Sequence, residues 1–183
     1  KIVILKPNDI YWLKESYKLA TMFKDYDSAI ELLKILAKVD EENSFFYKRE
    51  VVNVYIAKKD LYNLINYLEY LYKTDNAHRE YWEKELINLY IYQKKYKEAV
   101  NISLTQLGVE KNPVKRKEYF KKAVEVALWS KDFELTKNII SSHYKEFLND
   151  KEMMKFVLKS ALATGDSKFA HTIAIDIKQR FIE

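Results

Sequence analysis

Short polar breaks recur along the chain at an almost constant spacing. Each break separates two segments with helical periodicity of apolar residues, and the five breaks read FKDYDSA, AKKDLYNL, QKKYKEA, SKDFELT and TGDSKFA. Their last residues lie 35, 35, 37 and 34 positions apart, at Ala29, Leu64, Ala99, Thr136 and Ala170. A near-constant period of this size is typical of helical repeat proteins, in which each unit contributes two helices.

The composition favours helices and disfavours sheets. The 183 residues include only 2 glycines and 2 prolines, while 48% are hydrophobic, which is enough for a large core. We therefore predict an all-α fold, a right-handed α–α superhelix of about five helix-turn-helix repeats, in a single domain over residues 1–183. The expected units are 10–44, 45–79, 80–116, 117–150 and 151–183. The expected helices are 9–23, 26–39, 44–58, 61–73, 77–93, 96–107, 113–130, 133–147, 150–164 and 167–181.

Three stretches carry a more specific pattern, in which a short polar turn is followed three residues later by an alanine. They are KDYDSAIELLKIL (24–36), KKYKEAV (94–100) and LATGDSKFA (162–170). This pattern resembles the tetratricopeptide repeat (TPR) family, although most units lack its turn glycine and closing proline. LKPND (5–9) is similar to the end of a TPR unit, and the chain lacks a starting Met, so we expect a segment of a longer protein. The pentatricopeptide family, which reads RNA, is the alternative, and LGVEKNP (107–113) resembles its closing stretch.

Helical spacing predicts which first-helix residues are buried. The units are numbered from Ile10, Phe45, Glu80, Lys117 and Lys151. The third position then holds Trp12, Tyr47, Trp82, Tyr119 and Met153, and the tenth holds Leu19, Val54, Leu89, Val126 and Ser160. Positions separated by three or four residues share one face of a helix. We expect this face, including the Trp of the repeated Tyr-Trp-x-Lys-Glu motif, to be core.

The opposite face of the same helices is basic. The fifth position is a cation in every unit, and the ninth is usually a lysine or asparagine. We call the candidate binding residues at these positions the basic column: Lys14, Lys18, Arg49, Asn53, Lys84, Asn88, Lys121, Lys155 and Lys159. The TPR resemblance implies that this face lines a concave groove. It also implies that Arg49 with Asn53, and Lys84 with Asn88, hold the carboxylate of a bound peptide.

These residues predict a scaffold for protein–protein interaction that binds an acidic or carboxylate-bearing protein or peptide segment. A cation and an amide one helical turn apart point donors at the same anion. Three alternatives remain: a solvated lysine face, a binding track for an anionic polymer such as RNA or polysaccharide, and an envelope scaffold in bacterial polysaccharide export. Nucleic acid is disfavoured because few aromatic residues are expected among the bases.

Signatures of enzymes and of metal or cofactor sites are missing from the sequence. There is no phosphate loop, no G-x-S-x-G and no H-E-x-x-H, and the chain has no cysteine. We expect no enzyme activity, no cofactor and no metal. No apolar run approaches the roughly 18 residues of a membrane span, so we expect no membrane insertion by this segment. The compartment, cytoplasm or bacterial periplasm, stays open.

A second basic cluster, KNPVKRKEYFKK (111–122), opens the fourth unit. Asn112 and Pro113 have the residue types of an N-cap and a first helical residue. Lys115, Arg116 and Lys117 then lie at the positive end of the helix dipole, which is mildly unfavourable. We interpret the cluster as a solvated charge run, with an anion site as the alternative.

Overall fold

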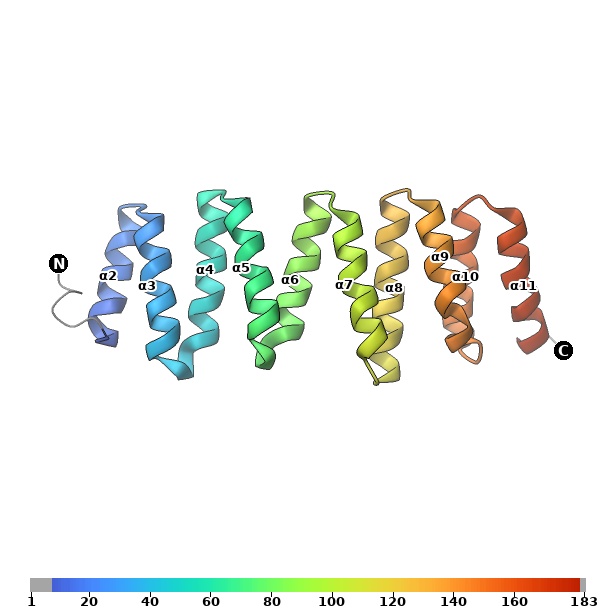
Figure 1. Cartoon of the computed structure of the whole chain (residues 1–183), viewed down its shortest axis with the longest axis horizontal. Coiled ribbons are helices and arrows are strands. Elements are labelled where there is room, and N and C mark those ends of the chain that lie inside the picture. The colour runs from blue at the N-terminus through green and yellow to red at the C-terminus, as the bar shows by residue number, and fades with distance from the viewer. Residues whose placement is uncertain (1–7, 182–183) are drawn as a thin grey trace. The chain divides into compact units, whose positions relative to one another are not determined.

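The computed structural model describes residues 8–181, and within this range it contains ten α-helices, three short 3-10 helices and no strand (Figure 1). The α-helices are α2 (Ile10–Met22), α3 (Tyr26–Val39), α4 (Ser44–Lys58), α5 (Leu61–Thr74), α6 (Arg79–Tyr92), α7 (Tyr96–Val109), α8 (Pro113–Trp129), α9 (Phe133–His143), α10 (Lys151–Ala163) and α11 (Ser167–Phe181). The 3-10 helices are η1 (Glu41–Asn43), η2 (Asn76–His78) and η3 (Tyr144–Phe147).

The prediction of an all-α repeat fold is confirmed. The expected helix over 133–147 is instead α9 followed by η3, and every other helix end lies within about two residues of its expected position. Residues 5–7 of the LKPND stretch lie outside the described residues.

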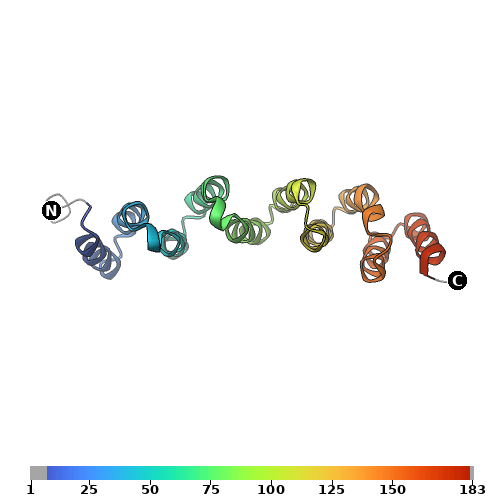
Figure 2. The ribbon, with the colours of Figure 1, turned by 90° about the horizontal axis from the view of Figure 1, so that it is seen from below.

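The chain divides into two compact units, Lys1–Leu86 and Ile87–Glu183, and the division passes through α6. In the first unit, α2 packs on α3, α3 on α4, and α4 on α5. In the second unit, α7 packs on α8, α8 on α9, and α10 on α11. Figure 2, which looks nearly along the helix axes, shows these sequence neighbours side by side. Each unit is therefore held together mainly by contacts between consecutive helices.

The turn inside each helix pair has the same backbone conformation. A lysine with φ between 56° and 59° follows the first helix in four of the turns, and Gly165 with φ 75° takes this place in the last. The lysines are Lys24, Lys59, Lys94 and Lys131. A residue in the left-handed region reverses the chain and leaves its successor free to bond back to the first helix, as Asp60 N does to Tyr55 O at 3.0 Å. These residues form the polar breaks that reveal the repeat in the sequence.

The core confirms part of the predicted face. Tyr47, Trp82 and Met153 are buried, and Trp82 has no exposed surface. Two first helices depart from the prediction: α2 at both the third and the tenth position, and α8 at the third position only. In α2, Trp12 is 37% exposed and Leu19 is 50% exposed. Their successors, Leu13 and Ala20, are buried instead.

In α8 the fully buried aromatic is Phe120, whereas Tyr119 is only half-buried. One residue corresponds to about 100° around a helix, so the two neighbours face different surroundings. Phe120 follows Trp82 by 38 residues (120 − 82), while the breaks between these units are 37 apart. The tenth position of α8, Val126, is nevertheless buried as predicted, so the departure in this helix is confined to its aromatic residue.

Among the helices within residues 8–181, none combines the length and the apolar character that a membrane crossing requires. The same residues include no group of three or more His, Asp or Glu side chains that could hold a metal ion.

Candidate functional site

The basic column lies on the first helix of each pair. Its members come from α2, α4, α6, α8 and α10, and all of them are at least partly exposed. They are Lys14, Lys18, Arg49, Asn53, Lys84, Asn88, Lys121, Lys155 and Lys159. The column thus occupies accessible surface, as any binding face must.

Cations of the column reach aromatic rings on the next first helix. Lys14 Nζ of α2 lies 5.9 Å from the ring centroid of Tyr47 in α4. In the second unit, Lys121 Nζ of α8 lies 5.8 Å from the ring centroid of Phe156 in α10. Cations within about 6 Å of an aromatic centroid are attracted by the ring's negative face. Within each unit, these contacts join neighbouring first helices along the column.

Arg49 contacts two aromatic rings in this way. Its guanidinium carbon lies 5.8 Å from the ring centroid of Phe45, one turn back in α4, and 5.5 Å from that of Tyr81 in α6. The rings of Phe45 and Tyr81 meet edge to face at 5.2 Å, which fixes the surface on which the guanidinium rests. Arg49 is nevertheless exposed, so the edge of its planar guanidinium still presents N–H donors to solvent.

Four members of the column already bind carboxylates of the chain itself. The shortest distances from a side-chain nitrogen to a carboxylate oxygen are 3.4 Å for Lys14 with Asp40, 2.5 Å for Lys18 with Glu15, 2.8 Å for Lys155 with Glu152 and 2.9 Å for Asn53 with Glu50. A partner ligand would have to compete with these contacts.

Lys14 is held by more than one group. The Tyr47 hydroxyl donates to Asp40 Oδ2 at 2.7 Å, and Lys14 lies against both side chains. Hydrogen bonding with Tyr47, followed by that with Asp40, raises the pKa of Lys14 above its usual value. Lys14 is therefore a charged member of an internal cluster rather than an independent donor.

The other five members have no carboxylate partner within the described part of the chain. They are Arg49, Lys84, Asn88, Lys121 and Lys159. Three of the engaged members pair with a glutamate three residues earlier in the same helix, a spacing that the sequence shows. Lys14 differs, because Asp40 lies beyond the end of α3 and reaches it only in the folded protein.

The second basic cluster is engaged inside the protein. Asn112 caps α8 as predicted, and its Oδ1 accepts from Val114 N at 2.9 Å. Arg116 donates to the carbonyl oxygen of Leu107 at 2.6 Å and forms an ion pair with Glu146. Lys117 pairs with the carboxylate of Asp150, likewise within the second unit. The interpretation of a solvated charge run is thus wrong for Arg116 and Lys117, which connect α8 to the segment between α9 and α10.

Comparisons with known proteins identify no family model that matches the chain and no matching curated protein. Among solved structures, the chain is similar to two crystal structures of a putative kinesin light chain from Podosopora anserina with nearly identical TPR-like repeats. The sequence identities are 13% and 14%, and the TM-scores are 0.45 and 0.47. Each alignment covers 94% of this chain, and 94% and 95% of the two matched chains.

The helix pairs share one turn geometry and one spacing. Each pair turns at a left-handed residue, and these residues follow one another at intervals of 34 to 37 positions. The chain is built of helix-turn-helix repeats. In the first unit, α2 and α3 form one repeat and α4 and α5 form the next.

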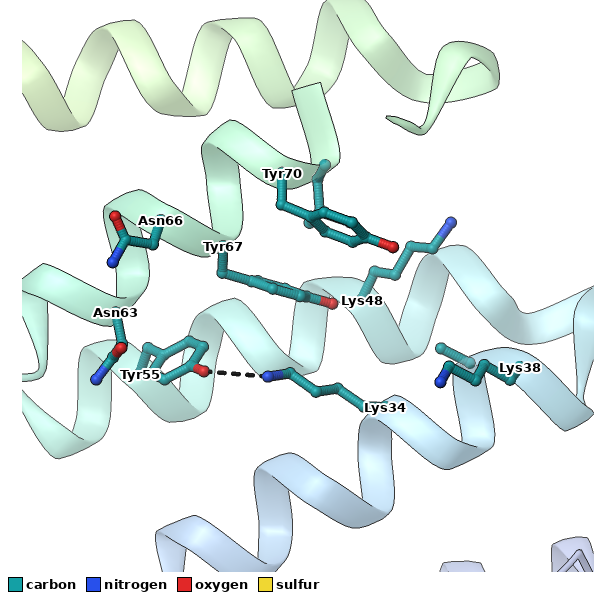
Figure 3. A pocket seen from close by; sticks show the side chains of 10 residues that line it. Lys34, Lys38, Lys48, Tyr55, Asn63, Asn66, Tyr67 and Tyr70 are labelled. Carbon is teal, nitrogen blue, oxygen red and sulfur yellow. Dashed lines mark hydrogen bonds between the residues drawn. The ribbon is translucent and has the colours of Figure 1, made fainter. Parts of the chain in front are cut away.

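A pocket of about 450 Å³ lies between the second helices of these two repeats, with α4 contributing the remaining wall (Figure 3). Its lining combines lysine, tyrosine and asparagine side chains with two apolar residues. They are Lys34, Ala37, Lys38, Lys48, Tyr55, Asn63, Asn66, Tyr67, Tyr70 and Leu71. Burial raises the pKa of Tyr67, so its phenol stays protonated over the physiological range.

Sequence periodicity did not reveal this pocket. Spacing of four between Lys34 and Lys38, and of three between Tyr67 and Tyr70, shows that each pair shares a face of its own helix. The packing that brings the two faces together was needed to recognise a site.

Proposed function

We propose that this chain is a scaffold for protein–protein interaction whose first helices bind an acidic or carboxylate-bearing protein segment. TPR-like repeats generally mediate protein–protein interaction, because stacked helix pairs present an extended surface to a partner. The single observation that carries the proposal is the position of Arg49, which rests on aromatic rings without a carboxylate partner within the described residues.

Arg49 and Lys84 border the same surface. Arg49 of α4 lies over Tyr81 of α6, and Lys84 follows Tyr81 by three residues, so Tyr81 and Lys84 share a face of α6. A carboxylate bound beside Tyr81 would receive charge-assisted hydrogen bonds from these two cations. Each such bond contributes about 1.5–3 kcal/mol to binding.

The second unit repeats this arrangement. Lys121 of α8 lies over Phe156 of α10, and Lys159 follows Phe156 by three residues. Both cations lack a carboxylate partner in the described structure. We infer that a partner with several acidic residues, rather than a single carboxylate, uses the column.

The engaged members of the column argue against an anionic polymer as the ligand. A polyanion binds through many equivalent phosphate or sulfate contacts along a basic track. Here Lys14, Lys18 and Lys155 are paired with carboxylates of the chain, which interrupts such a track. The available cations are instead grouped in pairs beside an aromatic ring.

Selection of peptides from a random library on the immobilised protein tests the proposal, followed by affinity measurement on the selected peptides. We expect enrichment of peptides with acidic residues or a free C-terminal carboxylate. The double substitution Arg49→Glu and Lys84→Glu should weaken their binding at least about tenfold, because two attractive contacts become repulsive. Added salt should also weaken binding less in this variant than in the original protein.

The matched control carries the same change of charge away from the column. Lys97 of α7 and Lys168 of α11 are exposed on second helices, so Lys97→Glu with Lys168→Glu should leave peptide affinity unchanged. Equal weakening by both double variants would indicate a response to net charge alone and would contradict a specific site. Selection of peptides without acidic groups would contradict the proposal directly.

A further inference from the structure

The pocket between α3, α4 and α5 has an uncompensated positive charge. No acidic side chain is among its described lining residues, which include three lysines. Lys48 is neutralised from outside the lining, because its Nζ lies 2.8 Å from Oδ2 of the buried Asp75. Lys34 has a hydrogen bond to the Tyr55 hydroxyl, at 3.3 Å, but neither Lys34 nor Lys38 has an ion-pair partner within residues 8–181. Two lysine charges on α3 therefore remain available to a ligand.

The opposite wall of the pocket is aromatic. The rings of Tyr67 and Tyr70 lie 6.4 Å apart between centroids and only 24° from parallel, and Tyr55 continues this wall at 5.9 Å from Tyr67. Figure 3 shows Lys34 directed toward this group from α3. Its Nζ lies 5.3 Å from the centroid of Tyr67. The pocket thus offers cations and flat ring faces within one small volume.

Neutral donors complete the lining. The Tyr67 hydroxyl and the Asn66 amide have no hydrogen-bond partner in the described structure, and Asn66 is exposed at the mouth of the pocket. A bound anion with several oxygens could accept from both, in addition to the lysines.

We propose that this pocket binds a phosphate monoester carried by a planar ring. Such a group carries a charge of about −1.5 to −2 at neutral pH, which matches the two uncompensated lysines, and its three terminal oxygens can each accept from donors of the lining. The ring would pack against Tyr67 and Tyr70, where stacked aromatic pairs gain stability beyond simple burial. This site is independent of the basic column, so either proposal can fail without the other.

Titration calorimetry with phenyl phosphate tests the proposal, and two related compounds separate its parts. Methyl phosphate keeps the anion without the ring, and benzoate keeps the ring with a single charge. We expect phenyl phosphate to bind at least about tenfold more tightly than either, since each comparison removes one set of contacts. Equal binding of methyl phosphate would overturn the role of the tyrosines, and equal binding of benzoate would overturn the match to a doubly charged anion.

Substitution of the two lysines tests whether phenyl phosphate binds in this pocket. Lys34→Gln with Lys38→Gln should weaken phenyl phosphate at least about tenfold, whereas Lys97→Gln with Lys168→Gln should leave its affinity unchanged. Lys38→Gln alone removes no contact of the described structure and should already weaken binding with the fold intact. Unchanged affinity in both pocket variants would overturn the proposal.

Two biological sources carry this chemistry, and two further ligands distinguish them. Tighter binding of N-acetyl-phosphotyrosine amide than of AMP would identify a phosphorylated tyrosine of a protein partner as the ligand. The opposite preference would identify a nucleotide. Failure of both to bind would overturn the proposal even if phenyl phosphate binds.

Discussion

Trp82 connects three parts of the first unit through one side chain. It is fully buried, its ring lies 5.4 Å from that of Phe45 in α4, and its Nε1 donates to Asp75 Oδ2 at 3.1 Å. Asp75 ends α5 and also accepts from Lys48 of α4 at 2.8 Å. The other oxygen of this carboxylate, Oδ1, lies 3.1 Å from Nδ1 of His78. The buried carboxylate is therefore satisfied by three side chains, and loss of the lysine or the indole would leave its Oδ2 under-paired.

Replacement of Trp82 by alanine should lower the free energy of unfolding by about 3–5 kcal/mol, because it leaves a cavity and removes a hydrogen bond to Asp75. Denaturant titration followed by circular dichroism measures this loss. Trp129 is 53% exposed and provides the control, since Trp129→Ala should cost less than about 1 kcal/mol. Similar losses in the two variants would contradict the buried position of Trp82.

The two copies of the Tyr-Trp-x-Lys-Glu motif show what the sequence could and could not predict. Periodicity correctly indicated which residues share a helix face, and Trp82 is core as predicted. Trp12 occupies the same place in the motif but is partly exposed, and its successor Leu13 is buried instead, whereas the residue after Trp82 is Glu83. Periodicity defines the residues of a face, whereas the direction of that face depends on the helices packed against it.

The same distinction applies to the basic column. Its exposure followed from helical spacing, because a polar arc opposite an apolar face must lie at the surface. The aromatic support of Arg49 and the capture of Lys14 by Asp40 depend on residues of other helices and turns. A sequence without contact information therefore could not show these two features, whereas the ion pairs of Lys18 and Lys155 follow a spacing of three that the sequence contains.

Among the helices, α7 begins in a different way from the other second helices. In those helices an aspartate precedes the first turn and accepts a backbone N–H, at distances between 3.0 and 3.2 Å. These residues are Asp25, Asp60, Asp132 and Asp166. The corresponding residue before α7 is Lys95, whose side chain makes no capping bond. The first N–H groups of α7 consequently lack an acceptor that its counterparts possess.

Replacement of Lys95 by aspartate should stabilise the second unit by about 1 kcal/mol, because it supplies the missing cap and a negative charge at the positive end of the helix dipole. The midpoint of denaturant unfolding should rise accordingly. Lys95→Ala removes the same lysine without adding an acceptor, so it should change the stability little. An equal gain in both variants would show that removal of the lysine, rather than capping, is responsible.

At the scale of the whole molecule, several aspartates in turns and at helix starts have lowered pKa values. The Tyr47 hydroxyl, followed by Asn43, lowers the pKa of Asp40 below its usual 3.8. Hydrogen bonds from Asn63 do the same for Asp60, and the ion pair with Lys117 does so for Asp150. Such groups stay ionised in the folded protein at a pH where the unfolded chain already binds protons.

We therefore expect stability to be constant from about pH 7 to pH 5 and to fall as the pH drops below about 4. The sign follows from proton binding: in this window the unfolded state takes up more protons, so acid favours it. Denaturant titrations at a series of pH values measure the effect. Asp40→Asn removes one of these carboxylates and should make the curve less steep in the acid range, whereas an unchanged curve would contradict the contribution of Asp40.

The packing of each helix on its neighbours in sequence also bears on how quickly the chain reaches its fold. Contacts such as α2 with α3 and α3 with α4 join segments that are close in the sequence. Forming them therefore costs little chain entropy. Proteins dominated by contacts of this kind fold in microseconds to milliseconds, far faster than those with distant pairings. A helix pair emerging from a ribosome, where synthesis adds about 5–20 residues per second, therefore has ample time to pack before the next pair appears.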